Sequence, residues 1–336
     1  MTTRPARPRR PERQPWSLER LLHERALALE HALDKSTHSS YSSALRSYLS
    51  FCDRQHFTIE PTEQTLSLYV IYECHHIEPR SVDSYLSGIC SELEPFYPNV
   101  RKIRSSNLVS RTLRGGKRLY SQPVKRKRAL TSDDIDLVFE RLHCSTKYDD
   151  LLFLTQLLTG FYALMRLGEL VWPDRHDLRS FTKVSRRTTV LLTTHSFEFT
   201  LRTHKSDRQF SGDSVLVHDD SLAGPRVVEL FKTYLALRDS AFPCRAELWL
   251  RHDGSIPTRS WFIRQLRTMF LDDPLVCGHS MRAGGATALA LAGVSGSLIQ
   301  ATGRWSSSAW ELYVRKHPVL MQALALAEQR QPQPRV

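Results

Sequence analysis

A short charged stretch, SQPVKRKR (121–128), divides this 336-residue chain into two blocks. A proline and four consecutive cations interrupt the apolar pattern that continues on both sides, and each block is long enough to bury a core of its own. We therefore predict two domains joined by a basic linker. The predicted ranges are a disordered basic arm over 1–15, a helical domain over 16–120, the linker over 121–129, a second domain over 130–327 and a disordered tail over 328–336.

The first block repeats apolar residues at helical spacing throughout. Five segments between Trp16 and Tyr120 have this pattern, and prolines at 61, 79 and 98 separate several of them. Short helices of this kind are marginal alone in water, so their apolar faces must pack together. We predict a compact bundle of four or five helices.

The second block mixes helices with a few strands. Thr131 and Asp134 have capping-box spacing at the start of DDIDLVFERL, and an apolar helix is expected over about 150–165. Between Thr188 and Val217, three short β-branched or aromatic segments are separated by polar turns, and helices resume from residue 222. The sequence therefore predicts a mainly α fold with one small antiparallel β-sheet.

A stretch rich in glycine and alanine, RAGGATALALAGV (282–294), stands out among the later helices. Such a helix can approach its neighbours closely because few of its residues carry large side chains. Gly293 then suits the position just after the end of a helix, where a left-handed backbone is common.

The chain carries a large positive charge. Lys plus Arg number 47 against 35 Asp plus Glu, which gives a formal net charge of +12 and a pI near 9.6. Such an excess favours a polyanionic partner, because each neutralised phosphate releases condensed counterions. A merely basic enzyme has the same composition, and charge alone leaves both interpretations open.

Cysteine usage and hydropathy indicate the compartment. The six cysteines are scattered with no CxxC pair, which is typical of reduced thiols inside a cell and argues against a structural zinc site. No apolar run is long enough to cross a bilayer, and the Arg/Pro-rich start lacks the apolar core of a signal peptide. We expect a soluble intracellular protein with no membrane partner.

Four stretches of the second block carry side chains suited to phosphate chemistry. They are ALMRLGEL (163–170), LRTHKSDRQ (201–209), GHSMRAGG (278–285) and GRWSSSAWELYVR (303–315). His279 and Arg282 lie three residues apart, so a helix brings both onto one face. Arg166 has the same spacing to Glu169, whose carboxylate can brace the guanidinium, and Lys205 is expected in a turn after a strand.

Two guanidiniums, an imidazole and an ammonium form a suitable cradle for a phosphodiester. The transition state of phosphoryl transfer gathers charge on the non-bridging oxygens, to which arginine presents planar, bidentate donors. No carboxylate cluster suited to Mg²⁺ accompanies these residues, so fixed cations would replace a metal. We predict no metal and no small-molecule cofactor.

Each of these signals also has a simpler interpretation. The HxxR pair can be a coincidence, Arg166 can cap the end of an apolar helix, and Trp305 and Tyr313 can be core aromatics of a C-terminal helix. The order and spacing of the whole set are more specific than any member.

That order resembles the tyrosine recombinase, or phage integrase, family. The family uses Arg, Lys, His-x-x-Arg, His or Trp, and then Tyr in a C-terminal catalytic domain, preceded by a SAM-like helical core-binding domain. The corresponding positions here are Arg166, Lys205, His279, Arg282, Trp305 and Tyr313. The resemblance covers residues 130–320, and reaches the N-terminal block by position and pattern only. The spacing from Trp305 to Tyr313 is eight residues, where many bacterial and phage members have nine and the eukaryotic mobile elements share the shorter spacing.

The resemblance implies a role for each residue. Tyr313 attacks the scissile phosphate and forms a 3′-phosphotyrosyl link. Lys205, as general acid, protonates the departing 5′-oxygen, which leaves as a free 5′-hydroxyl. Arg166 and Arg282 hold the non-bridging oxygens, and His279 assists proton transfer with the tyrosine. Trp305 donates from its indole or packs the site, and Glu169 supports Arg166. The reaction is a transesterification that needs no ATP, and a catalytic domain is thus expected over 130–327.

The resemblance also implies partners. Double-stranded DNA is the expected substrate, bound by a homo-tetramer on paired sites. The wording GRWSSSAWELYVRK is similar to the eukaryotic branch of the family, the fungal Crypton-like mobile-element recombinases, which implies the nucleus, or the cytoplasm of a bacterial host. The helix expected over HPVLMQALALAEQR docks either on a neighbouring subunit or on its own domain.

The basic linker has three possible roles. Lys125, Arg126, Lys127 and Arg128 can contact the DNA backbone, act as a nuclear-localisation patch, or form a solvated hinge. Three alternatives to an active recombinase stay open as well. They are a DNA binder with helix-turn-helix rhythm in ATALALAGVSGSLIQATGRW, a catalytically retired recombinase that only binds DNA, and a type IB topoisomerase.

Overall fold

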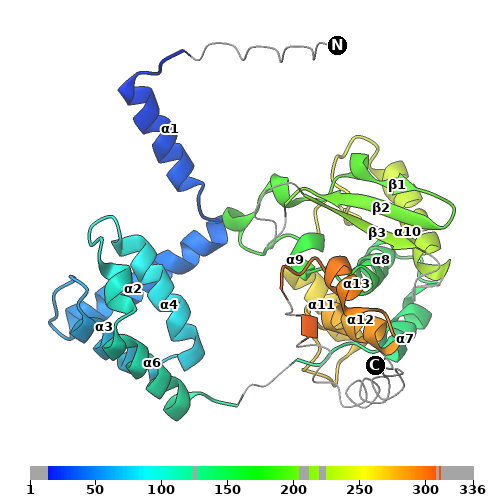
Figure 1. Ribbon diagram of the computed structural model, residues 1–336. Helices are drawn as coiled ribbons and strands as arrows, with labels where there is room; N and C mark the ends of the chain where they lie inside the picture. Colours follow the sequence, from blue (N-terminus) through cyan, green and yellow to red (C-terminus); the bar gives the residue numbers. More distant parts are fainter. Residues whose placement is uncertain (1–13, 124–126, 204–211, 219–224, 308–309, 312–336) are drawn as a thin grey trace, which may run out of the picture. The chain divides into compact units, whose positions relative to one another are not determined.

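The computed structural model describes residues 14–123, 127–203, 212–218, 225–307 and 310–311. The chain forms two compact units, Met1–Val124 and Lys125–Val336, whose boundary falls within the charged stretch that divides the sequence. The helices described in the first unit are α1 (Leu18–Glu30), α2 (Lys35–Arg54), α3 (Glu63–Cys74), α4 (Pro79–Leu93), α5 (Val100–Arg104) and α6 (Asn107–Tyr120) (Figure 1).

Two helix pairs make up the core of the first unit, α2 with α4 and α3 with α6. A glycine allows the close approach in each pair. A Cβ at Gly88 would lie 2.9 Å from the Cβ of Ala44, and one at Gly116 would lie 2.6 Å from the Sγ of Cys74. Buried aromatic rings such as Tyr48 fill the space between the pairs.

Helix α1 differs from the prediction. The sequence predicts it as part of the bundle, and the helix does form, with Ser17 as its N-cap. None of its residues is buried, however, and Leu18 and Leu29 remain about 70% exposed. The helical spacing of its leucines predicted the element correctly but not its partner, because amphipathic periodicity identifies an apolar face without identifying what covers it.

The second unit is mainly helical with one small sheet, as the sequence predicts. Its described helices are α7 (Ser132–Leu142), α8 (Tyr148–Tyr162), α9 (Leu167–Leu170), α10 (Pro225–Ala241), α11 (Arg259–Met269), α12 (Ser280–Leu291) and α13 (Gly296–Thr302). Strands β1 (Leu191–Leu192), β2 (Ser196–Leu201) and β3 (Asp213–His218) form an antiparallel sheet in the order β1-β2-β3. Short 3-10 turns connect α9 to β1.

Helix α8 is the centre of the second unit. Ten of its fifteen residues are buried, and it packs against α7, α10 and α12. The predicted capping box begins α7: the backbone N–H of Asp134 donates to the Thr131 hydroxyl at 3.2 Å, and that of Thr131 donates to the Asp134 carboxylate at 2.7 Å. Over the described residues, no helix is both long and apolar enough to span a membrane.

The glycine-rich start of α12 makes close contact with its neighbours, as its composition predicts. A Cβ at Gly284 would lie 2.2 Å from the carbonyl oxygen of Leu130, and one at Gly285 would lie 1.9 Å from that of Phe161 in α8. Gly293 follows the end of α12 with a φ of 77°, the left-handed conformation expected there. These contacts fix the depth at which α12 enters the core.

The predicted linker is shorter than the sequence indicates. Arg128 forms ion pairs with Asp134 at 2.5 Å and Asp273 at 2.6 Å, and its backbone N–H donates to Leu275. The ammonium of Lys127 donates to the carbonyl of Pro274 at 3.0 Å. The prediction of a basic linker over 121–129 therefore needs correction at its C-terminal end, where two carboxylates bind Arg128 and a backbone carbonyl binds Lys127 within the second unit.

A prediction follows for the basic stretch. Arg128→Ala should destabilise the second unit by about 1–2 kcal/mol, because it leaves two carboxylates without their guanidinium. Lys125→Ala and Arg126→Ala together should instead weaken DNA binding for all sequences alike and flatten its salt dependence. Thermal unfolding and salt titrations of binding separate the effects. Equal unfolding temperatures for Arg128→Ala and the wild type would contradict the first expectation. A loss of binding to some DNA sequences but not to others, in the double variant at Lys125 and Arg126, would contradict the second.

Candidate active site

Arg166 lies at the turn between α8 and α9. Its backbone N–H donates to one oxygen of Glu169 at 2.9 Å, and its Nη1 donates to the other at 3.0 Å. The carboxylate that the sequence predicts as a brace thus binds both the backbone and the guanidinium. The Glu169 side chain is 7% exposed and that of Arg166 26%, so the guanidinium extends from a buried anion toward solvent.

A second guanidinium also binds Glu169. Arg304 Nη2 donates to Glu169 Oε2 at 3.1 Å, and the Arg304 side chain is 7% exposed. Burial by itself raises the pKa of Glu169, but the charge of Arg304 and the hydrogen bonds and charge of Arg166 outweigh it, so the pKa lies below its usual value. Glu169 is therefore an anion at neutral pH, and the three groups together carry one net positive charge.

Arg282 is held in a fixed position inside the second unit. Its Nη1 donates to the carbonyl of Leu164 at 2.7 Å, and its Nη2 donates to the carbonyl of Gly303. The ring of Trp305 lies over the guanidinium, 4.3 Å from its carbon to the ring centroid, and Arg282 is 1% exposed. These contacts join α12 to the residues just before Arg166 and to the loop after α13.

His279 is the residue just before α12, and the charges of Arg166 and Arg282 act on its imidazole. The residue is exposed overall, but partial burial of the imidazole lowers its pKa, as do the charges of Arg282 and Arg166. The contact of Arg282 with the Leu164 carbonyl brings the start of α12, and His279 with it, to the segment that leads to Arg166. A lowered pKa leaves the imidazole neutral at pH 7, in the form that accepts a proton.

Trp305 contributes packing to this site. Its backbone is fixed by hydrogen bonds with Gln300, from Trp305 N to Gln300 O at 3.1 Å and from Gln300 Nε2 to Trp305 O at 3.2 Å. A Cβ at Gly303 would lie 1.7 Å from the Trp305 ring, so only glycine allows the indole to lie there. These contacts describe how the indole packs, and donation from its N–H stays a prediction.

Two residues with a positive φ lie among these contacts. Leu164, with a φ of 50°, accepts from Arg282 through its carbonyl, and Arg304 has a φ of 54°. Left-handed backbone is unfavourable for residues with a side chain and is retained only where surrounding contacts enforce it, often at functional sites. Here the contacts of Arg282 and Arg304 with the segment Ala163–Leu164 enforce it.

Not every predicted site residue can be located. Lys205, Tyr313, Lys125 and Arg126 lie outside the described residues. Arg166, His279, Arg282 and Trp305 come together with Glu169, whereas Arg128 and Lys127 are engaged elsewhere in the second unit. Among the described residues, no group of three or more His, Cys, Asp or Glu side chains is gathered as metal ligands would be.

Arg304 was missed at the sequence level. No local pattern marks it, because its partner Glu169 lies 135 residues earlier in the chain.

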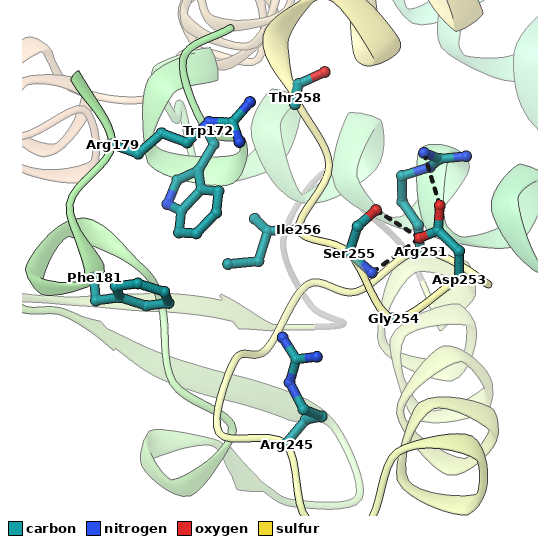
Figure 2. A pocket seen from close by; sticks show the side chains of 10 residues that line it. All are labelled: Trp172, Arg179, Phe181, Arg245, Arg251, Asp253, Gly254, Ser255, Ile256 and Thr258. Atoms are coloured by element: carbon teal, nitrogen blue, oxygen red, sulfur yellow. Dashed lines mark hydrogen bonds and ion pairs between the residues drawn. The ribbon is translucent and has the colours of Figure 1, made fainter. Parts of the chain in front are cut away.

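A separate pocket of about 380 Å³ contains none of these residues. An apolar wall of Trp172, Phe181 and Ile256 faces a rim of arginines (Figure 2). Two of these arginines already pair with acidic groups, Arg245 with Glu247 and Arg251 with Asp253. The rim therefore carries little uncompensated charge, and the pocket is not part of the phosphate cradle.

Comparison with solved structures identifies proteins that share this fold. No family model and no curated protein sequence matches the chain. Solved structures do match, among them the XerH site-specific recombinase bound to a palindromic difH substrate in a post-cleavage complex. That match has 13% identity, a TM-score of 0.61, and coverage of 87% of this chain and 80% of XerH.

Two further structures agree. The Tn1549 transposon integrase in complex with transposon right-end DNA matches with 13% identity and a TM-score of 0.59, over 92% of this chain and 98% of that one. A lambda integrase dimer bound to a COC′ core site matches with 12% identity and a TM-score of 0.54, over 87% and 93%. The chain therefore has the fold of the site-specific recombinases and integrases, with a mainly helical catalytic domain and its small antiparallel sheet.

Proposed function

We propose that this protein is a tyrosine recombinase that cuts and rejoins double-stranded DNA without a metal. The observation that carries the proposal is a contact between distant segments. Arg282, three residues after His279, donates to the carbonyl of Leu164, 118 residues earlier and two residues before Arg166, within a fold shared with DNA recombinases. Fixed guanidiniums stabilise charge that develops on the non-bridging oxygens, and removal of one such donor typically slows a reaction about 10²–10³-fold.

The proposed reaction is a transesterification. The Tyr313 phenol oxygen bonds to phosphorus as the bond to the 5′-oxygen breaks, and Lys205 gives that oxygen its proton. Arg166 reaches the phosphate from its buried carboxylate support, and Arg282 contributes charge from a position fixed by two carbonyl groups and Trp305. The phosphotyrosine retains the energy of the broken phosphodiester, so a 5′-hydroxyl can reverse the step.

His279 is proposed to accept the phenol proton in its neutral form. Because its pKa is lowered, the rate should fall as the pH decreases through that pKa, below the usual histidine value, and should be level at neutral pH. His279→Gln should lower the rate about 10²-fold or more and remove this acidic limb. Rates of covalent capture between pH 5 and 8 check it. An acidic limb unchanged in His279→Gln would assign the titration to another group.

The assembly and origin are part of the proposal. Matching structures include a lambda integrase tetramer bound to a Holliday junction, which supports a homo-tetramer on paired sites for this chain. The Tn1549 match supports a mobile-element recombinase. The eukaryotic, Crypton-like type and its action in the nucleus rest on the wording of the GRW segment alone. Sedimentation with and without paired DNA sites tests the tetramer.

The experiment for the function uses nicked duplexes with a randomised centre, because the target sequence is not known. In EDTA, the wild-type chain should form a protein–DNA complex that survives denaturation, and Tyr313→Phe should form none. Sequencing the captured strands then supplies a defined substrate. An absolute requirement for Mg²⁺, or undiminished capture by Tyr313→Phe, would contradict the proposal. Binding of the same duplexes without any capture would favour the retired recombinase.

A further inference from the structure

Glu169 lies between two guanidiniums that come from distant parts of the chain. Arg166 Nη1 is 3.0 Å from one carboxylate oxygen, and Arg304 Nη2 is 3.1 Å from the other. Glu169 and Arg304 are both buried, whereas Arg166 is partly exposed. The pair of Glu169 and Arg304 therefore lies within the protein. Of the two guanidiniums that bind Glu169, that of Arg166 is the one that a ligand can reach.

Arg304 also holds the backbone that leads to Arg166. Its Nη1 donates to the carbonyl of Ala163 at 3.4 Å and to that of Thr302 at 3.2 Å. Arg282 donates to the next carbonyl, that of Leu164, so two guanidiniums bind consecutive carbonyls where α8 ends. The loop after α13 is thereby fixed to the turn that presents Arg166.

We propose that Arg304 is a positioning residue: it binds and neutralises Glu169, so that this carboxylate orients Arg166 without cancelling the charge that Arg166 presents to a phosphate. The inference rests on the proposed function. Arg304 itself touches neither the phosphate nor the reacting oxygens in this account, and acts through Glu169 and the Ala163 carbonyl.

Charge balance gives the physical reason. Glu169 with Arg166 alone is a neutral pair, which weakly stabilises the charge that develops on the phosphate in the transition state, whereas the group with Arg304 keeps one net positive charge. The charge of Arg304 lowers the pKa of Glu169 against the effect of burial, together with the charge and the hydrogen bonds of Arg166. Without Arg304, Glu169 would take up a proton at higher pH and release Arg166. The charges of Arg166 and Arg282 also act on the imidazole of His279.

The test uses the full chain with Arg304→Met and Arg304→Lys, each with Glu169 and with Glu169→Gln. The rate of covalent capture and the DNA dissociation constant are measured separately, on a duplex whose sequence was selected by capture with the wild-type chain. Arg304→Met should slow capture about 10²-fold, as expected for a small displacement of a reacting group, with little change in binding. Arg304→Lys should recover most of the rate, because it keeps the charge beside Glu169. In the Glu169→Gln background, Arg304→Met should cause little further loss.

A matched control is Arg187→Met, which removes a guanidinium from its ion pair with Asp239, away from the site. It should lower the unfolding temperature without slowing capture. Wild-type capture rates in Arg304→Met, or losses that add fully to those of Glu169→Gln, would overturn the inference. If the wild type captures no DNA, the proposed function fails. The contact between Arg304 and Glu169 is then tested by the unfolding temperatures of the same variants. Unfolding temperatures that fall by the sum of the two single effects in the double variant would refute the contact.

Discussion

Replacement of Arg166 by alanine is expected to lower the rate of covalent DNA capture about 10²–10³-fold while the chain still folds and binds DNA. The guanidinium is the exposed member of its pair with Glu169, so its loss removes a charged donor from the phosphate and little from the core. Glu169 keeps Arg304 as a partner, which spares it the penalty of a buried charge alone. Single-turnover capture on a selected substrate measures the effect.

A nearby arginine provides the control for this prediction. Arg175 is 60% exposed and pairs with Asp177 at the surface of the same unit. Arg175→Ala removes the same charge from the chain, so it accounts for any general loss of electrostatic attraction to DNA. It should change the capture rate much less than Arg166→Ala. Equal losses in the two variants would mean that Arg166 acts through net charge and not at the phosphate.

Gly285→Ala should have the largest effect on stability, about 3 kcal/mol or more, because overpacking a tight contact forces backbone apart. The added Cβ would lie 1.9 Å from the Phe161 carbonyl oxygen, so α12 would have to move away from α8. That movement would also displace Arg282, which α12 carries. The expected fall in unfolding temperature is roughly 6–12 °C for a unit of this size.

Gly168 is the matched control for Gly285. It is a helical glycine of the same unit, and a Cβ there would meet nothing within 4 Å. Gly168→Ala should therefore leave stability within about 0.5 kcal/mol of the wild type. Calorimetry on both variants decides the matter. A Gly285→Ala variant as stable as the control would show that α8 and α12 are not in close contact in solution.

Local chemistry explains what the sequence predicted correctly. The capping box of Thr131 and Asp134 and the support of Arg166 by Glu169 each join residues three positions apart, and each strand follows from the residues within its own short segment. Spacing specifies such contacts directly, since backbone geometry fixes which neighbours can meet. The close approach of α12 was predictable from its glycines, although its partner in α8 was not.

Contacts between distant segments account for what the sequence did not predict. Arg304 and Glu169 are 135 residues apart, and nothing local to either residue indicates the pair. Arg128 was taken for a linker cation because Asp273, 145 residues away, gives no sign in the sequence of binding it. The exposure of α1 could not be predicted either, since the periodicity of its leucines does not indicate which segment covers them.

The most direct test of the central claim is to identify the residue that carries the DNA. After capture on a nicked duplex in EDTA, digestion and mass spectrometry of the conjugate should find a nucleotide joined through its 3′-phosphate to the peptide that contains Tyr313. An adduct on any other residue, or one attached through a 5′-phosphate, would contradict the proposed reaction.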